Sequence, residues 1–326
     1  MDKKAGTILK YALTSALAVI LVWLAFRGLD WSAFLQGLRQ TRWAYVVLFA
    51  VTAVAALVFR MLRWKALLNP IDPTAEPLLI WDADNIGNLA NIVIPGSGEF
   101  LRCGYLSGKK APYEKVLGTI ALERVCDVLA VAVLLILALT LNLGRFGSFF
   151  AERIWEPLKG RFSLGAWLVV AATIIVLGFS AWAIFHFRKR SAALDKAASV
   201  ISGLGQGFAS IAAMDRKWAF FAYTVGIWLM YILMCYSIIL ALPALSGLGF
   251  IDAVFISAVG NIASVIPVPG GIGAYHYLVA LCLSSLYAAP WETGILYATL
   301  CHELHAVIII LLGVISCIAI NLRKRK

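Results

Sequence analysis

Charged residues are scarce in this chain. Of its 326 residues, 14% are charged and 62% are hydrophobic, whereas about a quarter of the residues in an ordinary soluble domain are charged. The sequence also lacks a C-x-x-C pair, a Gly-x-Ser-x-Gly elbow and any polar stretch long enough to fold as a soluble domain. These absences argue against a soluble enzyme of the redox or serine-hydrolase type and indicate an integral membrane protein.

Long apolar runs fill most of the chain. Because about 20 mostly apolar helical residues cross the hydrocarbon core, we predict six full spans in an all-α membrane protein: 8–26, 43–62, 116–143, 164–187, 218–242 and 294–322. The first span follows Lys3 and Lys4, and no small-x-small cleavage site precedes Arg27. We therefore expect a retained anchor and not a cleaved signal peptide.

The basic residues are distributed unevenly between the predicted loops. The net charge of +11 would also suit a nucleic-acid-binding protein, but an N-terminus in the cytoplasm places nineteen of the 28 Lys and Arg on the cytoplasmic side, Arg60 and Arg63 among them, and seven on the other. Arg102 and Arg124 lie within or beside membrane segments. Because positive residues favour cytoplasmic loops, we predict an inner (plasma) membrane protein of bacterial type with both termini cytoplasmic and no nucleic-acid partner.

Two of the apolar segments are interrupted by proline and glycine. They read "GNLANIVIPGSGEFLR" from Gly87 and "GNIASVIPVPGGIGAYHY" from Gly260. Both begin with Gly-Asn-x-Ala and reach a Pro/Gly break a few residues later, so we predict an internal duplication. The predicted halves are about 43–143, with a broken element at 85–104, and about 218–322, with a broken element at 251–286.

The broken elements also fix the expected relation between the halves. The first is too short to cross twice and should be a re-entrant hairpin, whereas the second is either a deep hairpin or two short spans. Three predicted spans separate the two elements, so the halves should be inverted, as in many transporters with discontinuous helices. The fold expected is six full transmembrane helices plus two re-entrant or broken-helix elements in an inverted repeat.

A break in a membrane helix leaves backbone amides and carbonyls without partners, which hydrocarbon does not tolerate. The breaks should therefore line a polar site, where the N-terminal amides of the second arms favour an anion such as phosphate. For Glu99 two roles stay open: stabilising a helix N-terminus, or lining a substrate path as a partner of Arg102. The candidate site residues of the broken elements are Asn88, Asn91, Gly96, Gly98, Glu99, Arg102, Asn261, Gly270, Gly271, Gly273, Tyr275 and His276.

Ionisable residues also interrupt the long segment after each broken element. Glu123, Arg124 and Asp127 follow the first, and His302, Glu303 and His305 follow the second. Such residues are expensive in hydrocarbon, so they should face the protein interior and belong to the site. "CHELH" is not a zinc-protease motif, because its histidines are three apart rather than four and no third ligand is evident. We therefore predict no metal and no cofactor.

The motifs "PGSGEFLR", "ALERVCDVL" and "PVPGGIGAYH" resemble the flippase-like transmembrane domain of lysylphosphatidylglycerol synthases. The resemblance covers nearly the whole chain and implies translocation of a lipid. It does not extend to the soluble synthase domain of that family, so a stand-alone, non-enzymatic member is expected. In the first half it implies functional roles for Gly98, Glu99, Arg102, Glu123, Arg124 and Asp127.

The second half departs from the family pattern. Many relatives carry a glutamate where this chain has His276, and an arginine near the position of Glu303. If these two positions pair, the pair is kept here with its polarity exchanged, which would affect the choice of lipid.

Three functions remain open at this point. We favour a translocator of an anionic phospholipid or a lipid-linked phosphate such as a polyprenyl phosphate. One alternative is a membrane-embedded enzyme acting on lipid phosphates, with Glu99, Glu123 or Glu303 as general acid or base. The other is a non-transporting subunit that accompanies enzymes of lipid or glycan synthesis.

Overall fold

The computed structural model describes residues 18–94, 96–108, 110–141, 217–263, 268 and 271–324, with the isolated positions 16, 151, 156, 179 and 186. The regular structure in these ranges is helical. After a first helical segment, Ala18–Phe26, the elements are α2 (Trp31–Arg39), α3 (Trp43–Leu68), α4 (Pro77–Val93), α5 (Ser97–Leu106), α6 (Tyr113–Leu141), α10 (Lys217–Ala241), the short 3-10 helix η4 (Pro243–Leu245), α11 (Phe250–Ala263), α12 (Ala274–Tyr287) and α13 (Trp291–Lys324).

Three of the described helices, α3, α10 and α13, are long and apolar enough to cross a membrane. Ala18–Phe26 and α2 meet the same test only together, as a pair bent by 83°. Gly28 adopts a positive φ of 72° at this bend, and Asp30 Oδ1 then accepts hydrogen bonds from the backbone N–H groups of Ser32 and Ala33 to begin α2. The protein is therefore a multi-pass helical protein, while the predicted span 164–187 falls outside the continuously described residues.

The first broken element is a helical hairpin of α4 and α5. The chain turns at Gly96, whose φ of 82° is left-handed, and the two arms touch at a pair of glycines. A Cβ on Gly98 would lie 2.0 Å from the carbonyl oxygen of Gly87. The Gly98 N–H also donates a 2.8 Å hydrogen bond to Asn91 Oδ1, which satisfies one amide that the break leaves free. The first arm begins at Pro77, earlier than the predicted residue 85.

The second broken element is formed by α11 and α12, which also pack against each other. Before α12 the chain passes through Gly271 and Gly273, whose φ values are 73° and 83°. Tyr275 covers Gly260 so closely that a Cβ on this glycine would lie 2.6 Å from the ring. The connection that leads into this element, 242–249, has the same length as the connection into the first, 69–76.

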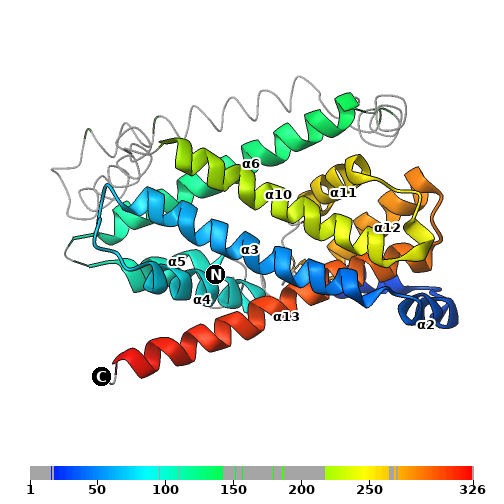
Figure 1. Cartoon of the computed structure of the whole chain (residues 1–326), viewed down its shortest axis with the longest axis horizontal. Helices are drawn as coiled ribbons and strands as arrows, with labels where there is room; N and C mark the ends of the chain where they lie inside the picture. Colours follow the sequence, from blue (N-terminus) through cyan, green and yellow to red (C-terminus); the bar gives the residue numbers. More distant parts are fainter. Residues whose placement is uncertain are drawn as a thin grey trace.

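The helices are arranged around the pair α3 and α10, which pack along each other through the middle of the molecule (Figure 1). The hairpin α4–α5 and the hairpin α11–α12 lie towards opposite ends of this pair. The first arms cross to the other half, because α4 packs on α13 and α11 packs on α6. The second arms stay in their own half, where α5 packs on α6 and α12 on α13. The packing is therefore reciprocal.

Candidate functional site

A network of buried charges joins α3, α4, α5 and α6. Arg102 on α5 is at its centre. Its Nη1 lies 2.9 Å from Asp84 Oδ1, and its Nη2 lies 2.9 Å from Glu123 Oε2. The contact between Nη2 and Glu123 is ionic and is not aligned as a hydrogen bond. The Arg102 guanidinium also stacks over the Trp64 ring, with 4.7 Å to the ring centroid. Planar contact with an aromatic face and two carboxylates suits a guanidinium better than an ammonium.

Two further arginines of α3 complete this network. Arg63 is fully buried and binds Asp127 through both Nη atoms, at 2.7 and 3.2 Å, and its Nε lies 3.5 Å from Glu123. Arg60 donates to both oxygens of Asp84, each at 3.3 Å. Arg102 therefore points to Asp84 and Glu123, and not to Glu99 as one of the two sequence hypotheses held.

Arg60 and Arg63 have a role that the sequence did not indicate. The sequence predicts only that both lie on the cytoplasmic side, whereas the structure shows them in the last turns of α3, paired with buried carboxylates. The pattern Arg-x-x-Arg before Lys65 is typical of a membrane boundary, so composition alone gives no sign of these partners. Asp84, which is not among the predicted site residues, was the available signal, since a carboxylate inside "LLIWDADNIGN" needs a buried cation.

The network carries an excess of positive charge within the described residues. Four guanidinium groups, those of Arg60, Arg63, Arg102 and Arg124, face the three carboxylates of Asp84, Glu123 and Asp127. Arg124 is the most accessible of the four, with 44% of its side chain exposed and its ion pair with Asp127 at 3.7 Å. An accessible guanidinium in a positively biased site favours an anion with several oxygens, such as a phosphate.

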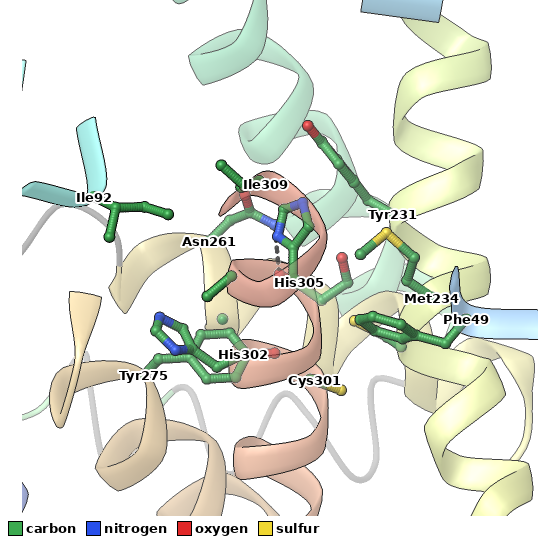
Figure 2. A pocket seen from close by; sticks show the side chains of 14 residues that line it. Phe49, Ile92, Tyr231, Met234, Asn261, Tyr275, Cys301, His302, His305 and Ile309 are labelled. Carbon is green, nitrogen blue, oxygen red and sulfur yellow. Dashed lines mark hydrogen bonds between the residues drawn. The ribbon is translucent and has the colours of Figure 1, made fainter. Parts of the chain in front are cut away.

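A cavity of about 300 Å³ lies where the two hairpins approach each other (Figure 2). The first hairpin contributes Ile92, from the end of α4, and the second contributes Gly260, Asn261 and Tyr275. Helices α3, α10 and α13 provide the remaining walls. Figure 2 shows Asn261 beside His305 and the Tyr275 ring beside His302. The other residues that line the cavity are Phe49, Tyr231, Met234, Cys235, Ser257, Cys301, His302, His305, Ala306 and Ile309.

Arg60 connects the charged network to this cavity. It is close enough to Tyr231 and His305 to interact electrostatically with both, and its Nη2 donates a 3.5 Å hydrogen bond to Asn88 Oδ1. The Nδ2 atom of Asn88 is buried without a hydrogen-bond partner in the described structure. Polar groups therefore continue from the charged network on α3 to the wall of the cavity on α13.

Next to the cavity lies a second polar cluster, formed by His276 on α12 and by His302 and Glu303 on α13. Glu303 Oε1 is 3.7 Å from His276 Nε2 and 3.0 Å from His302 Nδ1. The two imidazole rings are 5.4 Å apart between centroids. His276 and Glu303 thus lie next to each other as the sequence had suggested, with the imidazole on α12 and the carboxylate on α13.

Most of the remaining predicted residues that the structure describes shape the backbone of the two hairpins. Asn91 and Gly98 fix the first hairpin, and Gly96 makes its turn. Gly273 lies against the backbone of Leu21 and Val22, where a Cβ would come within 2.6 Å of Val22 N. A Cβ on Gly271 would be 3.4 Å from His302 Nε2. Glu99 lies in the first turn of α5 with one oxygen buried, and Gly270 is outside the described residues.

Two comparisons with known proteins match this chain. The model of the lysylphosphatidylglycerol synthase TM region matches residues 8–313. The glycosyltransferase AglD of Haloferax volcanii is 24% identical over 348 aligned residues, which cover 97% of this chain and 54% of AglD. The chain thus spans about half the length of this relative. No solved structure matches the chain.

Proposed function

Because this chain belongs to the family of lysylphosphatidylglycerol synthase TM regions, we propose that it moves an anionic phospholipid or a lipid-linked phosphate between the leaflets of a membrane. The observation that carries the proposal is the cavity to which both broken elements contribute, beside a charged network with more arginines than carboxylates. Transporters with discontinuous helices bind their substrates at such a meeting point.

The two halves act in this proposal as an inverted repeat. Their reciprocal packing supports it, since each first arm crosses to the other half and each second arm stays in its own. The polar pairs support it as well: α5 and α6 are joined by an arginine and a glutamate, and α12 and α13 by a histidine and a glutamate. With 164–187 as a further span, the chain crosses the inner membrane six times and keeps both termini in the cytoplasm.

The phosphate enters the path at Arg124, because Arg102 is buried and already neutralised by two carboxylates. It then passes Arg60 to reach the cavity, where Tyr231, Asn261 and His305 offer hydrogen bonds. His276, His302 and Glu303 lie beyond the cavity. The lipid chains stay in the hydrocarbon throughout, because moving apolar chains out of an apolar environment is unfavourable.

A leaflet-exchange assay in proteoliposomes tests this function. Fluorescent or spin-labelled phosphatidylglycerol, a polyprenyl phosphate and zwitterionic phosphatidylcholine are compared, and the anionic lipids should cross faster than the zwitterionic one. Arg124→Gln should slow the exchange of anionic lipids, while Arg39→Gln, at the end of α2, should not. Exchange no faster than in protein-free liposomes for every lipid would overturn the proposal. A chemically altered lipid, detected by mass spectrometry, would indicate an enzyme instead.

A second candidate function is that of a membrane subunit of a lipid- or glycan-synthesis complex. The name of the longer relative, a glycosyltransferase, is the observation that favours it. This candidate predicts stable co-purification with a synthesis enzyme and tolerance of Arg124→Gln in cells. Transport and complex formation are separated by the proteoliposome assay, because only a translocator acts when purified alone.

A further inference from the structure

We infer that His276, His302 and Glu303 form a binding site for a divalent first-row transition metal, for which Zn²⁺ is the natural probe. These residues come from two helices, α12 and α13, and one ligand atom of each lies within 4.8 Å of the others. The site goes beyond lipid translocation, because neither the description of the matched family nor the name of the relative refers to a metal.

The distances between the ligand atoms suit a metal centre. In a tetrahedral zinc site with bonds of about 2.0–2.1 Å, ligand atoms are about 3.3 Å apart. Glu303 Oε1 is 3.0 Å from His302 Nδ1 and 3.7 Å from His276 Nε2, which bracket this value. Two imidazoles and one carboxylate are also a ligand set that Zn²⁺ uses in catalytic sites, where a fourth position stays open.

His276 gives independent support, because its ring is buried with too few partners. The residue is 3% exposed and packs between Phe26, Tyr275 and His302. Its Nδ1 has no hydrogen-bond partner in the described structure, and its Nε2 lies 3.7 Å from the nearest carboxylate oxygen, too far for a hydrogen bond. The lone pair of Nε2 is therefore available to a metal, and the proton of the neutral ring then lies on Nδ1.

The site is also open on the side of Glu303. The Glu303 side chain is 47% exposed, so water or an anionic oxygen can fill the open coordination position. His302 faces the cavity at the same time. A metal here would therefore add positive charge at the far end of the proposed lipid path, where the described structure offers no arginine. This consequence rests on the proposed function, whereas metal binding itself does not.

The sequence argued against a metal for a reason that the fold removes. "CHELH" has the wrong histidine spacing, and His305 indeed lines the cavity apart from the cluster. The missing third ligand is His276, which lies on a different helix and is brought to α13 by the turn at Gly273. No spacing rule within one helix can detect such a ligand.

The experiment uses the full chain, purified without a polyhistidine tag and placed in nanodiscs. After treatment with a chelator, Zn²⁺ is added and bound metal is counted by mass spectrometry and calorimetry. We expect one Zn²⁺ per chain and a higher Tm, because a ligand that binds only the folded state stabilises it. Co²⁺ should give the visible absorption of a tetrahedral site.

The variants distinguish this site from binding elsewhere. His276→Ala and Glu303→Gln should each weaken Zn²⁺ binding about tenfold or more, since each removes one of three protein ligands. His305→Ala is the matched control and should keep the parent affinity. The proposal fails if the parent binds no Zn²⁺, if His276→Ala binds it as the parent does, or if His305→Ala loses it equally. Leaflet exchange is measured separately without added metal, so failure of either proposal is recognised on its own.

Discussion

Arg102 and Glu123 form a buried ion pair, with 2.9 Å between Nη2 and Oε2, that ties the second arm of the first hairpin to the long helix after it. In the second half, His276 and Glu303 tie α12 to α13 in the same way, at 3.7 Å. Each pair places the basic side chain on the hairpin and the glutamate on the long helix. Such matching contacts after the two Pro/Gly breaks are what the proposed duplication predicts.

Removing the cation of the first pair should destabilise the fold. Arg102→Gln leaves Asp84 and Glu123 buried with one arginine fewer. Because breaking a buried ion pair costs about 3–5 kcal/mol, and Arg60 and Arg63 still neutralise part of the charge, we expect a loss of about 3 kcal/mol in the free energy of unfolding. Arg124→Gln, at a half-exposed position, should cost less than about 1 kcal/mol. Equal losses, measured by denaturant titration in detergent, would contradict the network.

The contact between Gly87 and Gly98 should tolerate no side chain. In Gly98→Ala the new Cβ would lie 2.0 Å from a backbone oxygen, which only a movement of the hairpin relieves. We expect a loss of about 3 kcal/mol, at the upper end for overpacking, together with slower leaflet exchange. Gly104→Ala, where the Cβ meets nothing within 4 Å, should be neutral or slightly stabilising. A stable Gly98→Ala protein would show that the arms do not touch.

Much of the architecture follows from local sequence. The first hairpin turns at Gly96 because glycine adopts a left-handed φ without strain. The apolar length of α3, α10 and α13 identifies them as membrane helices without any tertiary information. Helix α2 and the bend of 83° before it were not predicted, because the predicted first span ends at residue 26, before the turn at Gly28.

The site was only partly predictable, for a physical reason. Residues within one helix turn, such as Glu123 and Asp127, can be assigned to one face from spacing alone. The partners of Arg102, however, lie on α4 and α6, and a single sequence holds no record of which faces meet. The burial of Arg63 was not predictable, because a buried arginine and an interfacial arginine look alike in composition.

The pair of His276 and Glu303 should still join α12 and α13 when an acidic residue stands at position 276 and a basic residue at position 303. His276→Glu alone puts a second carboxylate next to Glu303 and should lower the Tm, because like charges at such a distance repel. The double variant His276→Glu/Glu303→Arg restores an ion pair and should recover most of that loss. Thermal unfolding in nanodiscs measures both proteins. If the double variant is as unstable as His276→Glu, the two positions do not hold the helices together.

Polarity inside the cavity should govern transport more than stability. Asn261 lines the cavity, and within the described residues its Nδ2 donates a hydrogen bond to the carbonyl oxygen of Ser257 on the same helix. Asn261→Leu keeps the volume but removes the amide, so we expect leaflet exchange to fall about tenfold, since one lost hydrogen bond to a charged group is worth about 1.5–3 kcal/mol. Ser284→Ala, on the exposed side of α12, is the control. Unchanged exchange with Asn261→Leu would place the lipid path elsewhere.

The proposed inverted repeat makes a prediction about the two sides of the membrane. The connections 69–76 and 242–249 precede equivalent hairpins, and inversion requires them to lie on opposite sides. Thr74 and Ser246 are exposed within these connections, so each can carry a cysteine with little disturbance. In intact cells, a membrane-impermeant maleimide should label Ser246→Cys, whereas Thr74→Cys should react only after the membrane is opened. The parent protein measures the background from its six native cysteines, which are at most partly exposed. Labelling of both positions from the same side would rule out inversion, because the number of crossings between the two hairpins would then be even.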